Sequence, residues 1–114
     1  AGAVDEWRAA GAKVEVVGAG RDGAGVDLDG VFALLGREGV LQAMVEGGGT
    51  LLGSVVGGGH AQRLVAYVAP TLLGTGGRPA FAFSGPRTIG DAQRWRPASV
   101  ARVGDDIRVE LEAP

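Results

Sequence analysis

Two stretches of the chain place apolar residues at the three- and four-residue spacing of an amphipathic helix. The first covers residues 3–10 and stops at Gly11. The second begins at Leu28, where Asp27 or Asp29 can cap the first turn. It continues through Val31, Phe32, Leu34 and Leu35 to a glycine, Gly39, that can close it in a left-handed conformation. The pattern therefore predicts two helices in the first forty residues.

Three other segments have the composition of strands. Residues 13–17 alternate with period two, whereas residues 40–45 and 64–68 are mostly apolar runs, typical of strands covered on both faces. Between the last two, residues 51–56 form a short helical pattern that Thr50 can cap and a glycine run can stop. The resulting order of strand, helix, strand, helix and strand implies parallel pairing through right-handed crossovers.

The C-terminal part of the chain carries a different pattern. Residues 99–103 and 107–111 flank Gly104-Asp105-Asp106, which is typical of an antiparallel hairpin. The connection from Pro70 to Arg94, rich in Gly, Pro, Thr and Arg, is longer than ordinary connections and indicates a functional loop. We expect an α/β fold in three layers, with a mostly parallel sheet, helical crossovers and a C-terminal antiparallel hairpin.

Composition removes several classes of protein. The 114 residues include 22 glycines, but 46% are hydrophobic and 21% are charged, which argues against disorder. The glycines have no period of three, so collagen is excluded. Because there is no cysteine, disulfides, thiolate nucleophiles and Cys-ligated metals are excluded as well. A net charge of −2 without a basic patch argues against a nucleic-acid partner, and no apolar run approaches membrane-spanning length. We expect a cytoplasmic protein.

Residues 18–23 match the dinucleotide-binding pattern G-x-G-x-x-G directly after a predicted strand, and Glu46 ends the next one. In that motif the glycines must open the helix so that its first amides meet the pyrophosphate. Here residues 26–29 intervene, and the aspartates among them would repel a phosphate. We interpret this match as a structural turn.

A second glycine-rich turn, Gly47-Gly48-Gly49-Thr50, leaves a predicted strand and immediately starts a helix. Amides at such a helix start can bind phosphate, and glycine lets the ligand approach closely. Glu46, just before it, could accept hydrogen bonds from ligand hydroxyl or amine groups. The turn lacks Gly-Lys-[Ser/Thr] and so is not a Walker A loop. On the pattern alone, a tight strand-to-helix turn explains it equally well.

The remaining side chains that could bind a metal or act as nucleophiles form no recognisable motif. His60 has no partner at metal-ligand spacing, so we expect a surface role for it and no metal site. Ser54 and Ser84 have no general base in a recognisable order, which gives nucleophilic catalysis no support. No catalytic residue is assigned.

Several motifs together carry a family resemblance over roughly residues 40–112. They are Val-Glu-Gly-Gly-Gly-Thr-Leu-Leu-Gly at 45–53, Leu-Val-Ala-Tyr-Val-Ala-Pro-Thr-Leu-Leu-Gly at 64–74, Arg94-Trp95, and Val-Gly-Asp-Asp at 103–106. In order and spacing they resemble the C-terminal half of the riboflavin-biosynthesis pyrimidine reductase domain. That domain has the dihydrofolate-reductase-like fold and is often fused behind a deaminase.

The resemblance implies NADPH-dependent reduction of 5-amino-6-(5-phosphoribosylamino)uracil, a pyrimidine nucleotide, to its ribitylamino product. It also implies a homodimer, a substrate contact at Glu46, and a loop over residues 70–77 that walls the site. The implied NADPH contacts are Gly48, Gly49, Thr50, Leu51, Leu52, Gly53 and Ser54.

The Lys-x-Ala-x-Ser-x-Asp-Gly segment that opens the family domain is not in this sequence, nor are the deaminase motifs His-x-Glu and Pro-Cys-x-x-Cys. We therefore predict that residues 1–114 are the C-terminal part of a single reductase domain, inactive alone. Two alternatives stay open: another NADPH reductase of the same fold with a different substrate, and a non-catalytic nucleotide-binding or dimerisation module.

Overall fold

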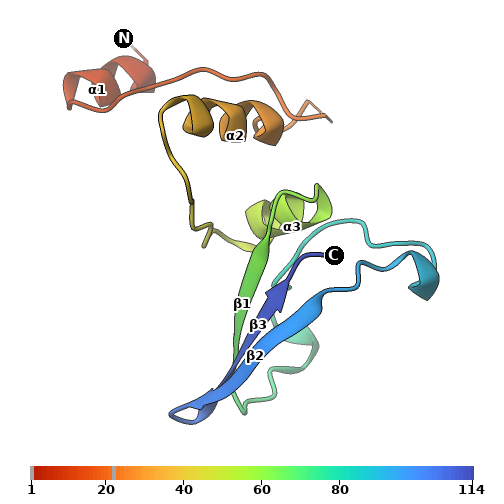
Figure 1. Cartoon of the computed structure of the whole chain (residues 1–114). Helices are drawn as coiled ribbons and strands as arrows, with labels where there is room; N and C mark the ends of the chain where they lie inside the picture. Colours follow the sequence, from red (N-terminus) through yellow and green to blue (C-terminus); the bar gives the residue numbers. More distant parts are fainter. Residues whose placement is uncertain (1, 22) are drawn as a thin grey trace. The chain divides into compact units, whose positions relative to one another are not determined.

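The computed structural model describes residues 2–21 and 23–114. Its backbone forms two compact units, residues 1–43 and 44–114. Figure 1 shows the elements coloured along the chain.

The first unit contains two helices, α1 (Ala3–Ala9) and α2 (Leu28–Arg37), where the sequence predicts them. Asp27 is the N-cap of α2, and its carboxylate accepts a hydrogen bond of 3.1 Å from the amide of Asp29. At the other end Gly39 has φ +81°, a left-handed conformation that a residue with a Cβ rarely adopts. Both predicted ends of α2 are therefore confirmed.

The two strands predicted at residues 13–17 and 40–45 do not form in the part of the chain that the structure describes. A strand exists only through hydrogen bonds to a neighbouring strand, and neither segment belongs to a ladder. Their large side chains are accordingly not buried: Val16 is 84% exposed, Leu41 100% and Met44 85%. The prediction of two strands, the second of them covered on both faces, was wrong here, because a strand pattern does not supply the neighbouring strand that must pair with it.

The second unit contains the helix α3 (Gly49–Gly57) and the strands β1 (Arg63–Val68), β2 (Arg96–Val103) and β3 (Asp106–Glu112). The strands form one sheet in the order β1-β3-β2, and both pairings are antiparallel (Figure 1). The mostly parallel sheet is not confirmed. Its parallel pairs required the two segments that form no ladder, and the only described neighbour of β1 is β3, which runs the opposite way.

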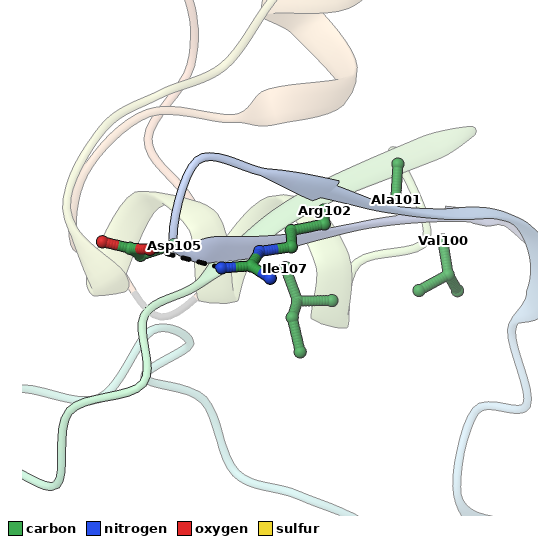
Figure 2. Close-up of a pocket in the computed structure, with 5 residues that line it drawn as sticks. All are labelled: Val100, Ala101, Arg102, Asp105 and Ile107. Atoms are coloured by element: carbon green, nitrogen blue, oxygen red, sulfur yellow. Dashed lines mark hydrogen bonds and ion pairs between the residues drawn. The ribbon is translucent and has the colours of Figure 1, made fainter.

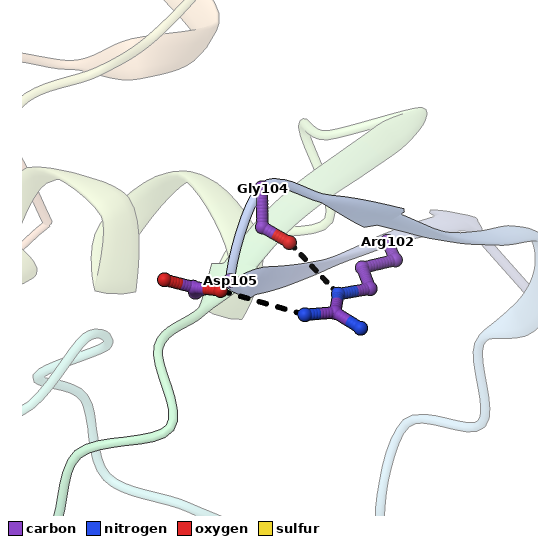
Figure 3. A network of polar contacts seen from close by, with 3 residues as sticks. All are labelled: Arg102, Gly104 and Asp105. Carbon is purple, nitrogen blue, oxygen red and sulfur yellow. Dashed lines mark hydrogen bonds and ion pairs between the residues drawn. The ribbon is translucent and has the colours of Figure 1, made fainter.

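The C-terminal hairpin of β2 and β3 is confirmed. Gly104 turns the chain with φ +62°, and Arg102 fastens the turn by donating to the carbonyl of Gly104 at 2.8 Å and pairing with Asp105 at 3.4 Å (Figure 3). The ladder shifts register between Pro97 and Ser99, where proline cannot donate a backbone hydrogen bond.

The two faces of this sheet differ in chemistry. On one face, cross-strand partners of β1 and β3 are apolar: Leu64 lies opposite Leu111, Ala66 opposite Val109 and Val68 opposite Ile107. On the other face Arg108 pairs with Glu110, and Arg96 with Glu112. The prediction of a β1 strand covered on both faces was wrong, since Tyr67 is 60% exposed and Val68 52%.

Buried apolar side chains in the described residues are Val55 and Val56, both on α3. The connection between β1 and β2 contains two short 3-10 helices, η1 (Gly74–Gly76) and η2 (Ile89–Asp91). It contacts α3 through Gln93, whose side-chain amide donates to the carbonyl of Val56 at 3.1 Å. None of the helices in the described residues has the length and apolar character needed to cross a membrane.

Candidate functional site

The N-terminus of α3 is formed by glycine backbone and has no side-chain cap among the described residues. Gly48 is the N-cap, with φ −70° and ψ 172°, and no side chain in the described structure caps the helix. Thr50 lies inside the first turn, so the expectation that it caps the helix was wrong. A helix leaves its first amides without partners, and within the described residues those of Gly49, Thr50 and Leu51 have no hydrogen-bond acceptor.

The electrostatics of this helix start favour an anion. The first turn carries no acidic side chain, so nothing in it offsets the positive end of the helix dipole. A Cβ placed on Gly48 would have no heavy atom within 4 Å, so the space beside the N-cap is open. Open space, free amides and a first turn without acidic side chains are the conditions under which a helix start binds phosphate. The residues here fit the phosphate groups of a nucleotide.

The side chains predicted to contact NADPH lie in different surroundings. Thr50 and Ser54 are exposed, and the Ser54 hydroxyl donates to the carbonyl of Thr50 at 3.0 Å, which directs it along the helix. Leu51 is 43% exposed and Leu52 is partly buried. The exposed side chains of the first turn are therefore available to a ligand bound at the N-terminus.

Gly49 and Gly53 also lie against the long loop between β1 and β2, which the sequence analysis did not predict. Gly53 is buried, and a Cβ built on it would lie 2.5 Å from the carbonyl oxygen of Ala82. A Cβ on Gly49 would lie 2.4 Å from the carbonyl oxygen of Pro79. Both glycines permit the long loop to pack directly on the helix. The spacing of Gly49, Gly53 and Gly57 at every fourth residue was the signal that could have predicted this packing.

Glu46 lies two residues before the N-cap and is exposed. Among the described residues it makes no hydrogen bond or ion pair, so both carboxylate oxygens can accept hydrogen bonds from a ligand. Glu46 and residues 48–54 belong to the same compact unit. The predicted substrate contact and the predicted nucleotide contacts are thus adjacent along one segment.

The first glycine-rich loop is a tight turn, as interpreted from the sequence. The amide of Gly20 donates to Gly25, and that of Gly23 donates to Gly20. Ala19 and Val26 form a bridge across the loop. Asp22, which belongs to the same pattern, lies outside the described residues. Because these amides serve the turn itself and α2 is capped by a carboxylate, the described part of this loop does not offer a phosphate site.

Other chemistry finds no support in the described structure. It contains no group of three or more His, Asp or Glu side chains that could hold a metal ion. The backbone amide of His60 donates to the carbonyl of Val55 and so helps to close α3. A shallow hollow at the hairpin is lined by Val100, Ala101, Arg102, Asp105 and Ile107 (Figure 2). Its two charged side chains pair with each other, which leaves no free reactive group there.

Comparison with known proteins supplies the family. Residues 3–109 match the model of the RibD C-terminal domain. The chain belongs to the RibD C-terminal domain family. This membership agrees with the resemblance carried by residues 40–112 and extends it to nearly the whole chain.

Two of the proteins that the chain is similar to are named riboflavin biosynthesis protein RibD. The riboflavin biosynthesis protein RibD of Mycobacterium tuberculosis (strain H37Rv) is 43% identical over 70 residues, which are 61% of this chain and 20% of the relative. The protein of the same name from Escherichia coli K12 is 30% identical over 86 residues, 75% of this chain and 23% of the relative.

The solved structure of Acinetobacter baumannii RibD, form 2, matches with a TM-score of 0.72 at 25% identity, covering 80% of this chain and 26% of that one. The chain therefore spans about a fifth to a quarter of the length of the relatives it matches.

Proposed function

We propose that the chain supplies the nucleotide-binding part of a reductase in riboflavin biosynthesis, which uses NADPH to reduce 5-amino-6-(5-phosphoribosylamino)uracil to its ribitylamino product. The observation that carries the proposal is the uncapped N-terminus of α3, whose free amides and open N-cap lie within a segment that matches the RibD C-terminal domain. The proposal includes that residues 1–114 act as the C-terminal part of a single reductase domain.

In this proposal the backbone of α3 holds the cofactor. The amides of Gly49, Thr50 and Leu51 donate to a phosphate of NADPH, and the absent side chain at Gly48 lets that phosphate approach. The hydroxyl of Thr50 is an additional donor. The bound nicotinamide supplies a hydride, and the protein contributes orientation and electrostatics.

Glu46 has the separate role of orienting the substrate. Its carboxylate is exposed and accepts hydrogen bonds only, so it suits the hydroxyl and amine groups of an aminopyrimidine nucleotide. A charged acceptor forms stronger hydrogen bonds than a neutral one. Glu46 therefore favours one placement of the substrate beside the cofactor.

Replacing Gly48 by Asp tests the cofactor site. Asp is a better N-cap than Gly, so Gly48→Asp should leave α3 folded or stabilise it slightly. Its carboxylate would nevertheless occupy the amides and repel a phosphate, and like charges in contact cost several kcal/mol. We expect NADPH binding, measured by fluorescence titration of the complete gene product, to be abolished.

Gly48→Asn is the matched control. Its side chain has nearly the size and capping ability of Asp but no charge, so it should weaken NADPH binding clearly less than Gly48→Asp does. If Gly48→Asp bound NADPH as tightly as the unmodified protein, the phosphate would lie elsewhere and the proposed site would be wrong.

A further inference from the structure

The long loop between β1 and β2 packs on α3 along one face. The amide of Ala82 donates to the carbonyl of Gly49 at 2.8 Å, which joins the loop to the first turn of the helix. Gln93, further along the same loop, donates to the carbonyl of Val56 near the other end of the helix. The loop is therefore attached to α3 at two places.

The contact depends on glycine at three positions of the helix. A Cβ on Gly49 would meet Pro79, a Cβ on Gly53 would meet Ala82, and a Cβ on Gly57 would lie 2.9 Å from the ring of Phe83. At Gly49 and Gly53 the opposing atoms belong to the backbone, at 2.4 and 2.5 Å, distances that no real Cβ contact tolerates. Any larger residue at these two positions must displace the loop or the helix.

Gly49 belongs both to the loop contact and to the first turn of the helix. Its amide is one of the free donors proposed to hold the phosphate, and its carbonyl accepts the hydrogen bond from Ala82. Gly53 is one turn further along and is buried beneath the loop. The side of α3 that carries the three glycines is therefore occupied by the protein itself, and a ligand can reach only the end and the remaining sides of the helix.

We propose that residues 79–83, by packing on Gly49, Gly53 and Gly57, fix the position of the N-terminal amides of α3, so that Gly53 is a positioning residue for nucleotide binding that does not itself touch the nucleotide. This inference rests on the proposed function for its ligand, NADPH. It assigns the glycine face of α3 to the loop and the N-terminal end of α3 to the phosphate.

The test combines two substitutions with two measurements on the complete gene product. Gly53→Ala places a methyl group against the backbone of Ala82, whereas Phe83→Ala removes the ring that lies against Gly57 and so weakens the packing of the same loop without changing the sequence of α3. Hydrogen exchange of the Ala82 amide reports whether the loop is attached. The dissociation constant of NADPH, measured well below the unfolding temperature, reports whether the phosphate site is in place.

We expect both substitutions to accelerate exchange of the Ala82 amide by about tenfold or more. We expect them to weaken NADPH binding by roughly 10- to 100-fold, since a small displacement of binding groups has an effect of this size. Gly36→Ala is the matched helical control, because a Cβ there has no heavy atom within 4 Å, and Ile89→Ala is the control for removing an exposed apolar side chain from the same loop. Neither control should change the exchange of Ala82 or the affinity for NADPH.

Each outcome decides a separate point. Should Gly53→Ala fail to fold, Phe83→Ala gives the result. Unchanged exchange of the Ala82 amide in a folded variant would overturn the packing contact. Faster exchange with unchanged NADPH affinity would overturn the positioning role. An unmodified protein that binds no NADPH would overturn the proposed function, and the positioning role with it, whereas the exchange measurement would still decide whether the loop is held by the glycine face.

Discussion

The helices α2 and α3 both follow a glycine-rich turn, yet their ends are built in opposite ways. The N-terminus of α2 is closed by side chains: Asp27 caps it, and Asp29 adds a second carboxylate in the first turn. The N-terminus of α3 has no side-chain cap and no acidic residue in its first turn. In α2 the first amides and the helix dipole stabilise the helix itself, whereas in α3 both remain available for an anionic ligand.

The helices also differ in what holds them. Glu38, the C-cap residue of α2, is bound by the Lys13 ammonium at 2.7 Å, so charged side chains secure α2 at both ends. The long loop contacts α3 through the backbone of the helix: it packs on the glycines, and the Gln93 side chain donates to a main-chain carbonyl. A helix held through backbone contacts can keep a free N-terminus in place without using a charged group that would compete with the ligand.

Among the substitutions that compare the surroundings of the two helices, the largest effect is expected at Glu46, the carboxylate that precedes α3. Among the described residues Glu46 makes no hydrogen bond or ion pair, so Glu46→Gln should not change stability but should remove a charge-assisted hydrogen bond to the substrate, worth about 1.5–3 kcal/mol. The KM for the pyrimidine substrate should rise while the dissociation constant of NADPH stays nearly the same. Steady-state kinetics of the complete gene product, with NADPH affinity measured separately, would test this, and an unchanged KM would remove Glu46 from the substrate site.

An intermediate effect is expected at the cap of α2. Asp27→Ala removes the hydrogen bond to the Asp29 amide and should lower the free energy of unfolding by about 1 kcal/mol. Because α2 holds no ligand in our proposal, NADPH affinity should not change. Chemical denaturation followed by circular dichroism measures the loss.

Thr50→Ala provides the comparison at α3. Thr50 is not the cap, so this substitution should cost clearly less stability than Asp27→Ala. The contrast between the two helix starts would be lost if the two substitutions destabilised the protein equally.

The smallest expected effect is the pH dependence of the ion pair beside α2. The hydrogen bond with Glu38 raises the pKa of Lys13 above its ordinary value, and the same contact lowers the pKa of the Glu38 carboxyl. Stabilisation by Glu38 is therefore present above its unfolded pKa and is lost as the pH falls through the lowered folded value. Stabilisation by Lys13 is present below its unfolded pKa and is lost as the pH rises through the raised folded value.

Both groups of this pair are exposed, so the shift in the unfolding midpoint should be small and should shrink with added salt. Lys13→Met should remove the part of the acid-side decline that is due to Glu38. Comparing the unfolding midpoints of the two proteins at neutral and at acidic pH would measure this difference. Equal declines in the two proteins would mean that the pair does not contribute to stability.

Local sequence signals predicted the elements whose hydrogen bonds close within a short segment. The bounds and ends of α2 followed from Asp27, the apolar spacing and Gly39, and the C-terminal hairpin followed from two strand patterns around Gly104. Residues 13–17 and 40–45 show the limit of such signals. A strand needs hydrogen bonds from a distant segment, so its formation and direction are not encoded in its own pattern.

For the candidate site, the sequence alone identified the segment: Glu46 and the glycine-rich start of a helix, with a family resemblance that membership in the RibD C-terminal domain family confirms. Only the tertiary structure decided what each glycine does. Gly48 faces open space, whereas Gly49 and Gly53 lie against backbone atoms of residues 79–82, thirty residues further along the chain. A sequence pattern records that a side chain is absent, but which atoms occupy the space beside it depends on how distant parts of the chain pack together.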